Sequence, residues 1–252
     1  MTSPHSATIL LPDGRNATVR AFSGNVQKIL SDQKRMVDGD GLEAVVREVA
    51  QIDGKPLTTV DVRALRVGVR DRLLIEARRR TYTDRVKDKV QCAECSEAYP
   101  VEVDLSKIES VPYPDGDITV VIEGRTFVLG WLSNAHEHDH AEGERKRIWG
   151  ATDLPLVQVK TVDGERLGPK LLLEIEGNIL DDVRKAARLS VPLHRLEPER
   201  EPVAYEPPFD AIPVGGTATR IETWCRHCDA RNVVQLAALP DFLFRGLRSL
   251  RD

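Results

Sequence analysis

The chain has 252 residues, with 36 basic and 40 acidic side chains, a formal net charge of -4, and 41% hydrophobic residues. This length and apolar content suit one large or two modest folded domains and argue against wholesale disorder. The mild negative charge argues against a general polyanion-binding protein, and no apolar run approaches the ~20 residues that a membrane helix needs.

The first 58 residues predict a hairpin followed by two helices. Runs that favour β-structure flank Asp13-Gly14, a dipeptide suited to a tight turn, so residues 8–22 predict an antiparallel hairpin. Residues 25–36 predict one helix, and residues 42–49 predict a second with apolar positions at helical spacing. The chain start shows no basic segment followed by an apolar stretch, so we expect no secretory signal and infer synthesis in the cytoplasm.

Residues 59–80 predict the strongest helix, in which an apolar stripe faces a set of arginines. The arginines are Arg63, Arg66, Arg70, Arg72, Arg78, Arg79 and Arg80. We expect them to form a solvated basic face, and a docking face for an acidic partner subunit is the sharper alternative. Nucleic acid is the third alternative, because Tyr82 is the one aromatic residue available for stacking between residues 61 and 90.

Strands are predicted on both sides of each of two cysteine pairs. They span residues 86–91, 99–105, 217–224 and 232–236. The region between them predicts a hairpin, a helix, a short strand, and one or two further helices. These elements span residues 117–131, 142–149, 156–161 and 171–189. Residues 193–213 contain five prolines and predict an extended arm, whereas residues 240–250 predict a short amphipathic helix that needs an apolar cover.

The four cysteines fall as two CxxC pairs, Cys92/Cys95 and Cys225/Cys228, with none left over. In a chain without a secretory signal this pattern favours a metal over disulfides. Four thiolates suit tetrahedral zinc, and a closed four-sulfur site is structural rather than catalytic. We therefore predict one structural Zn²⁺ per chain, in a zinc-ribbon-like site whose halves are separated by residues 96–224. Redox-active pairs and unligated thiols are the alternatives.

A second cluster of metal-ligating residue types reads His136-Glu-His-Asp-His140. Its i,i+2 spacing suits a loop, so we expect a solvated polar loop that caps a helix beginning near Glu142. A second metal and a metal-dependent enzyme built on these histidines form the alternative. The sequence lacks a nucleophile elbow, a phosphate-cradling glycine loop and a dinucleotide fingerprint, so we predict no enzyme, no catalytic residues and no cofactor besides zinc.

One stretch carries a family resemblance. It reads VGVRDRLLIEARRRTY from Val67 to Tyr82, then Asp84-Arg85, and then Cys92-x-x-Cys95. This segment resembles the T4-type baseplate proteins of contractile phage tails and of phage-tail-like injection systems, with Thr83 in place of a frequent glycine. The resemblance implies a structural subunit of the baseplate or tail hub, or a protein that assists its assembly. It supports zinc binding by the first cysteine pair and, less directly, by the second.

The sequence therefore predicts an α+β protein with a Cys₄ site built from two distant knuckles. We divide it into a hairpin-and-helix module, an Arg-rich helix with the first knuckle, a central α/β insertion, a proline-rich arm, and the second knuckle with a C-terminal helix. These segments span residues 1–58, 59–110, 111–192, 193–216 and 217–252. Expected partners are other baseplate or tail subunits in a large symmetric assembly, without nucleic acid or membrane insertion. An assembly chaperone that leaves the particle, or a zinc-ribbon adaptor for nucleic acid or protein, are the alternatives.

Overall fold

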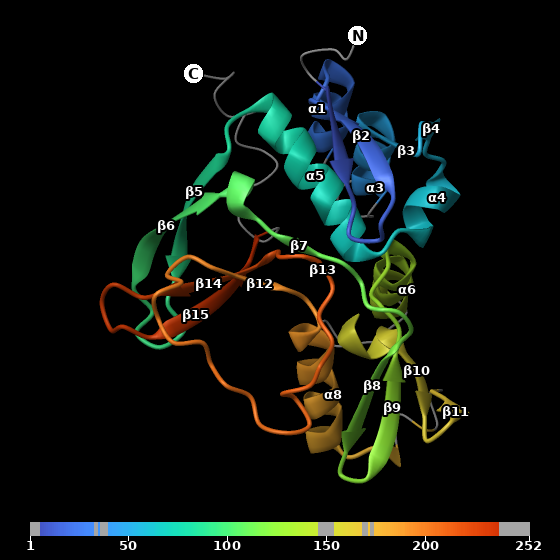
Figure 1. Ribbon diagram of the computed structural model, residues 1–252, viewed down its shortest axis with the longest axis vertical. Coiled ribbons are helices and arrows are strands. Elements are labelled where there is room, and N and C mark those ends of the chain that lie inside the picture. Colours follow the sequence, from blue (N-terminus) through green and yellow to red (C-terminus); the bar gives the residue numbers. More distant parts are fainter. Residues whose placement is uncertain are drawn as a thin grey trace.

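The computed structural model describes residues 6–32, 35, 40–145, 154–167, 171 and 174–236, and all structural statements concern these residues. Helices and strands mix along the chain, which confirms the α+β class (Figure 1). Three hydrophobic clusters form the cores. The predicted helix at residues 240–250 and the last four residues of the one predicted at 142–149 lie outside the described residues.

The N-terminal core lies between a four-stranded antiparallel sheet and helices. Its elements are β1 (Ser6–Leu10), β2 (Asn16–Arg20), β3 (Ala50–Ile52), β4 (Lys55–Pro56), α1 (Gly24–Ser31) and α3 (Asp40–Val49). The predicted first hairpin is confirmed, and Gly14 turns it with φ +83°. Both predicted helices are present, and Ser23 caps α1 by accepting a hydrogen bond from the N–H of Val26.

The single helix predicted over residues 59–80 is wrong: the segment forms α4 (Thr59–Ala64) and α5 (Val67–Thr81). Leu65 and Arg66 between them are extended, and Arg66 forms a β-bridge with Ser133. The N–H of Val67 donates to the carbonyl of Leu132 over 2.8 Å. The backbone around Leu65 and Arg66 therefore pairs with residues 132–134 instead of continuing the helix.

The solvated basic face predicted for this segment is also wrong in part. Arg70 and Arg78 of α5 are only 7% and 1% exposed, because the helix is packed into two cores at once. Leu73 belongs to the N-terminal cluster, whereas Ile75 belongs to a second cluster formed with the cysteine-bearing strands. The buried Arg78 donates to the carbonyl of Thr83 and so fixes the end of the helix.

The second core joins two hairpins that are distant in sequence. The first is β5 (Arg85–Gln91) with β6 (Ala98–Asp104), followed by the 3₁₀ turn η1 (Leu105–Lys107). The second is β14 (Arg220–Trp224) with β15 (Arg231–Gln235). These strands confirm the ones predicted around both cysteine pairs. Figure 1 shows the two hairpins side by side, on the opposite side of α5 from the N-terminal sheet.

The third core lies under a sheet with the order β11-β10-β9-β8. Its elements are β8 (Ile118–Ile122), β9 (Arg125–Leu129), η2 (Leu154–Gln158), β10 (Val159–Val162), β11 (Glu165–Arg166) and α8 (Gly177–Leu189). The hairpin predicted to turn at Glu123-Gly124 is confirmed. The strand predicted from residue 156 begins later, because the 3₁₀ turn η2 occupies residues 154–158.

Two further predictions need correction. Residues 136–140 belong to helix α6 (Asn134–Arg145) and are not a loop, because the hydroxyl of Ser133 accepts from the N–H of His136 in the first turn. The proline-rich arm contains β12 (Leu193–Arg195), which pairs in parallel with β14. It is followed by β13 (Gly216–Thr217), which pairs with β7 (Ser110–Val111). Backbone pairing at both ends thus ties the arm to the body of the protein.

Candidate metal centre

The first cysteine pair sits on the turn between β5 and β6. The N–H of Cys92 donates to the carbonyl of Glu97 over 2.9 Å, and the N–H of Ser96 donates to the carbonyl of Cys92 over 3.0 Å. Ser96 has a left-handed backbone with φ 61°, which reverses the chain directly after Cys95. This compact turn holds two thiols close to one point.

The second pair repeats this geometry position for position. The N–H of Cys225 donates to the carbonyl of Ala230, and the N–H of Asp229 donates to the carbonyl of Cys225, both over 2.9 Å. Asp229 is the left-handed residue here, with φ 58°. The N–H of His227 donates to Cys225 Sγ over 3.4 Å, so the backbone of the turn itself stabilises charge on the sulfur.

The two turns face each other and bring all four predicted cysteines together. The Sγ atoms of Cys92 and Cys228 are 3.7 Å apart, those of Cys95 and Cys225 are 3.6 Å apart, and all four lie within 4.8 Å of one another. A disulfide requires ~2.05 Å, so the thiols are free. A tetrahedron with metal–sulfur bonds of ~2.3 Å has edges of roughly 3.8 Å, and the observed spacing fits that figure.

The thiols differ in acidity. The N–H of Cys95 and the side-chain amide of Asn232 help to lower the pKa of Cys92 to about 6, against the effect of burial. The N–H of Glu97 lowers the pKa of Cys95, but burial and the neighbouring sulfurs outweigh it and raise this pKa to about 12. Cys92 therefore ionises readily, whereas Cys95 resists ionisation. A bound divalent cation removes that resistance, because metals bind the deprotonated thiolates.

Asn232 is a site residue that the sequence reasoning missed. It is 7% exposed, and its Oδ1 accepts from the N–H of Ala93 over 3.0 Å. Its Nδ2 donates to the carbonyl of Ala230 over 3.0 Å and approaches Cys92 Sγ at 3.6 Å. One side chain thus links both knuckles. An asparagine four residues after a CxxC was the only signal available in the sequence.

Ion pairs surround the second knuckle. Arg200 contacts Asp229 at 2.7 Å, and its guanidinium lies 4.4 Å from the ring centre of Trp224. Glu222 on β14 is 2% exposed and pairs with Arg195 on β12 and with Arg231 on β15. Two arginines of the arm, Arg195 and Arg200, therefore form ion pairs with the hairpin that carries Cys225 and Cys228.

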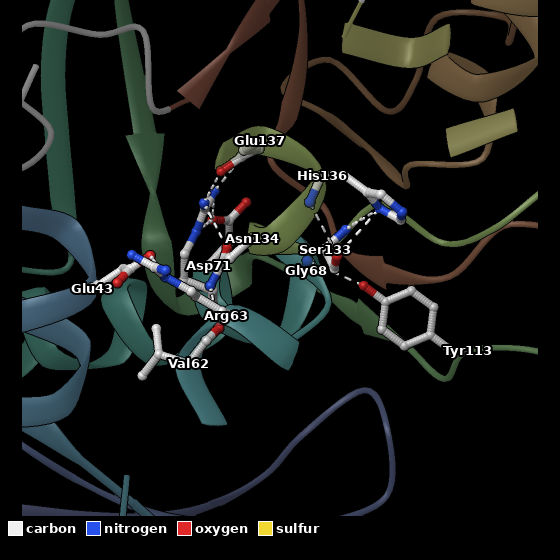
Figure 2. Close-up of polar contacts among 11 residues, drawn as sticks. Glu43, Val62, Arg63, Gly68, Asp71, Tyr113, Ser133, Asn134, His136 and Glu137 are labelled. Carbon is white, nitrogen blue, oxygen red and sulfur yellow. Dashed lines mark hydrogen bonds and ion pairs between the residues drawn. The ribbon is translucent and has the colours of Figure 1, made fainter. Parts of the chain in front are cut away.

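The histidine cluster forms no comparable site within the described residues, where the four cysteines are the one group of metal-ligating side chains found close together. His136 Nδ1 accepts from the N–H of Ser133 over 3.1 Å, as Figure 2 shows, and burial lowers its pKa. His136 thus contributes to the first turn of α6. No described helix combines the length and the apolar character needed to cross a bilayer.

Comparison with known families adds to this geometry. Residues 3–142, more than half of the 252-residue chain, match the family described as T4 bacteriophage base plate protein. The chain belongs to the T4 bacteriophage base plate protein family. No curated protein and no solved structure matches it. The resemblance seen in residues 67–95 is therefore confirmed, and membership supports a structural baseplate role.

The family match of this T4-type baseplate protein ends before its second cysteine pair. Cys92 and Cys95 lie inside the matched residues, whereas Cys225 and Cys228 lie beyond them. The four-sulfur cluster therefore joins the family region to the C-terminal part of the chain. In the structure the family region also supplies α5, the helix shared by the first two cores.

Proposed function

We propose that this T4-type baseplate protein is a structural subunit of the baseplate or tail hub of a contractile phage-tail-like particle. One zinc ion bound by Cys92, Cys95, Cys225 and Cys228 would fix two distant parts of the chain. The spacing of the four sulfurs carries the proposal, because it suits a closed tetrahedral site that has no position for a substrate.

The role of the metal is geometric. Zinc would supply bonds to four thiolates and thereby hold the β5–β6 hairpin against the β14–β15 hairpin. A zinc-ribbon arrangement of this kind gives rigidity to a core that two short hairpins and one helix would stabilise only weakly. The two hairpins held by zinc would then present the surfaces around them to neighbouring subunits in a fixed orientation. The segments before, between and after the two knuckles would form the modules that carry these surfaces.

The experiment is particle assembly in cells that supply the subunit as wild type, Cys92→Ser, Cys228→Ser or His227→Ala. His227 lies within the second knuckle but contributes no sulfur, so it is the matched control. We expect particles with wild type and His227→Ala and none with either cysteine variant. Normal assembly with both cysteine variants would overturn the proposal. Mature particles that contain no copy of the subunit would instead identify an assembly chaperone.

A further inference from the structure

A cavity of about 460 Å³ lies where α5, α6, α8 and the β7–β13 pair meet. It is remote from the cysteines and plays no part in the metal site. Apolar side chains from four parts of the chain form much of its wall, namely Val67, Trp131, Leu132, Leu154 and Val191. A cavity of this size accommodates one or two long side chains, and these walls suit an apolar stem.

One wall carries a buried ionic cluster in which carboxylates outnumber cations. Arg70 Nε and Nη2 donate to Asp71 Oδ1 at 3.0 and 2.9 Å. Its Nη1 donates to Asn134 Oδ1 over 2.8 Å and to Glu137 Oε2, and Nη2 reaches Glu137 Oε1 at 3.4 Å. Figure 2 shows Asp71, Asn134 and Glu137 close to one another. One cation faces two carboxylates, which is a formal surplus of one negative charge, and burial together with Glu137 raises the pKa of Asp71.

Asp71 carries the carboxylate of this cluster that can accept a further hydrogen bond in the cavity. It lines the cavity and exposes only 9% of its side chain. Both hydrogen bonds that it accepts within the described residues go to Oδ1, which leaves Oδ2 without a donor. Because Oδ2 accepts no hydrogen bond from these residues, it is the acceptor that Asp71 can offer to a cation in the cavity.

The chemistry of the cavity favours an organic cation over a metal ion. Both oxygens of Glu137 and one of Asp71 are already bound to Arg70, so a metal would find a single free carboxylate oxygen. Ca²⁺ and Mg²⁺ require several oxygen ligands. A guanidinium or ammonium on an aliphatic stem needs only one strong acceptor together with apolar walls.

Two further arginines line the cavity. Arg188 on α8 and Arg220 on β14 line it, and Arg220 Nη1 donates to the carbonyl of Arg188 over 2.7 Å. These two guanidinium groups favour a carbonyl or carboxylate there. The cavity therefore offers an acceptor for a cation at Asp71 and donors for an anion at Arg188 and Arg220, and a basic residue within an acidic or carbonyl-rich peptide matches both.

We propose that this cavity binds an arginine or lysine side chain from an extended segment of a neighbouring baseplate subunit. The cation contacts Asp71 Oδ2, the stem lies against Trp131 and Leu154, and the peptide's carbonyl or acidic groups face Arg188 and Arg220. The neighbouring subunit as the source rests on the proposed function, whereas the preference for a cation rests on the cavity alone.

The probe is Nα-acetyl-L-arginine, which carries a guanidinium and a carboxylate, and the control is Nα-acetyl-L-citrulline, an isostere that keeps the carboxylate but has an uncharged side chain. Binding to the full chain is followed by the NMR resonance of the Trp131 indole N–H, assigned with Trp131→Phe. We expect the arginine compound to bind at least tenfold more tightly than the citrulline compound. Asp71→Asn should reduce arginine binding tenfold, whereas Glu102→Gln, on an exposed carboxylate, should leave it unchanged.

Equal binding of the two probes, or no binding of either, would overturn the proposal. If Asp71→Asn does not fold, thermal unfolding of the wild type decides instead, because only the arginine compound should raise its midpoint. The source is tested with a photocrosslinking residue at Leu154 in assembled particles. A crosslink to a basic segment of another subunit supports the proposal, and a crosslink to a second copy of this chain overturns it. Probe binding needs no zinc and no particle, so its failure is distinct from failure of the proposed function.

Discussion

Thr217 donates a hydrogen bond from Oγ1 to the carbonyl oxygen of Gly68 over 2.6 Å, across 149 positions of sequence. The N–H of Gly68 donates to the hydroxyl of Tyr113 over 3.1 Å. The first turn of α5 is therefore bonded on both sides, to the strand that leads into the second cysteine hairpin and to the segment that leads into the central sheet. The family region and the C-terminal part of the chain meet here without help from a metal.

Gly68→Ala tests this close approach. An added Cβ would lie 2.5 Å from Tyr113 Oη and 2.7 Å from Gly216 Cα, and the second of these neighbours is backbone that cannot move aside cheaply. We expect a loss of about 1–3 kcal/mol in the free energy of unfolding. Gly177→Ala, at a helix start with nothing within 4 Å, is the control. Urea denaturation of both variants gives the comparison, and equal stability would contradict the account.

Asn232→Ala tests the link between the knuckles. Because Asn232 bonds Ala93 and approaches Cys92 Sγ, its loss should loosen the first knuckle while all four thiols remain. Removal of such outer partners typically weakens metal affinity roughly 10–100-fold. Chelator competition measures the change, with Asn178→Ala on the exposed surface as control. Zinc retention equal to that of wild type would show that the amide does not organise the site.

Glu222→Gln tests the ion pair between the arm and β14. The carboxylate is buried between Arg195 and Arg231, so its neutralisation leaves two guanidinium groups without their counter-ion. We expect a loss of about 3 kcal/mol in unfolding free energy. Glu102→Gln, whose partners are solvent-exposed, should change stability little. A small effect of Glu222→Gln in chemical denaturation would mean that the arm is not anchored through this pair.

His136 predicts a dependence of stability on pH. Burial lowers its pKa, and its Nδ1 must stay unprotonated to accept from Ser133. The unfolded chain then takes up the proton first as pH falls below about 6.5, so this contribution is present above that pH and is lost toward the lower folded pKa. His136→Asn keeps an acceptor and does not titrate.

Thermal unfolding between pH 7 and 5 should therefore show a steeper loss for wild type than for His136→Asn. His194, whose pKa burial also lowers, and Cys92, whose pKa is about 6, are present in both proteins, so their effects cancel in the comparison. Parallel curves for the two proteins would rule out His136 as a source of acid sensitivity.

Local patterns in the sequence predicted those parts of the fold that depend on neighbouring residues. Asp13-Gly14 turns the first hairpin as expected, and the strands around Cys92 and Cys225 follow from alternation and turn chemistry. The spacing of the cysteines also predicted that four sulfurs would meet, because metal-type knuckles depend on very short motifs.

Long-range contacts account for the errors. The predicted helix over residues 59–80 is interrupted because Arg66 forms a β-bridge with Ser133, and no local pattern near Leu65 predicts that bridge. Arg70 is buried because two carboxylates, one from a distant helix, compensate its charge, whereas composition alone favours an exposed arginine. The cavity beside Asp71 exists only once segments that are distant in sequence are assembled.

The proposed zinc ion, bound by the four cysteines, would hold the chain together. Elemental analysis of the purified full chain tests it most directly, applied to wild type, to each of the four Cys→Ser variants and to His227→Ala. The account predicts one zinc per chain in wild type and His227→Ala, and loss of zinc together with loss of folding in each cysteine variant. Folded wild-type protein without metal, or zinc that survives the cysteine substitutions, would contradict it.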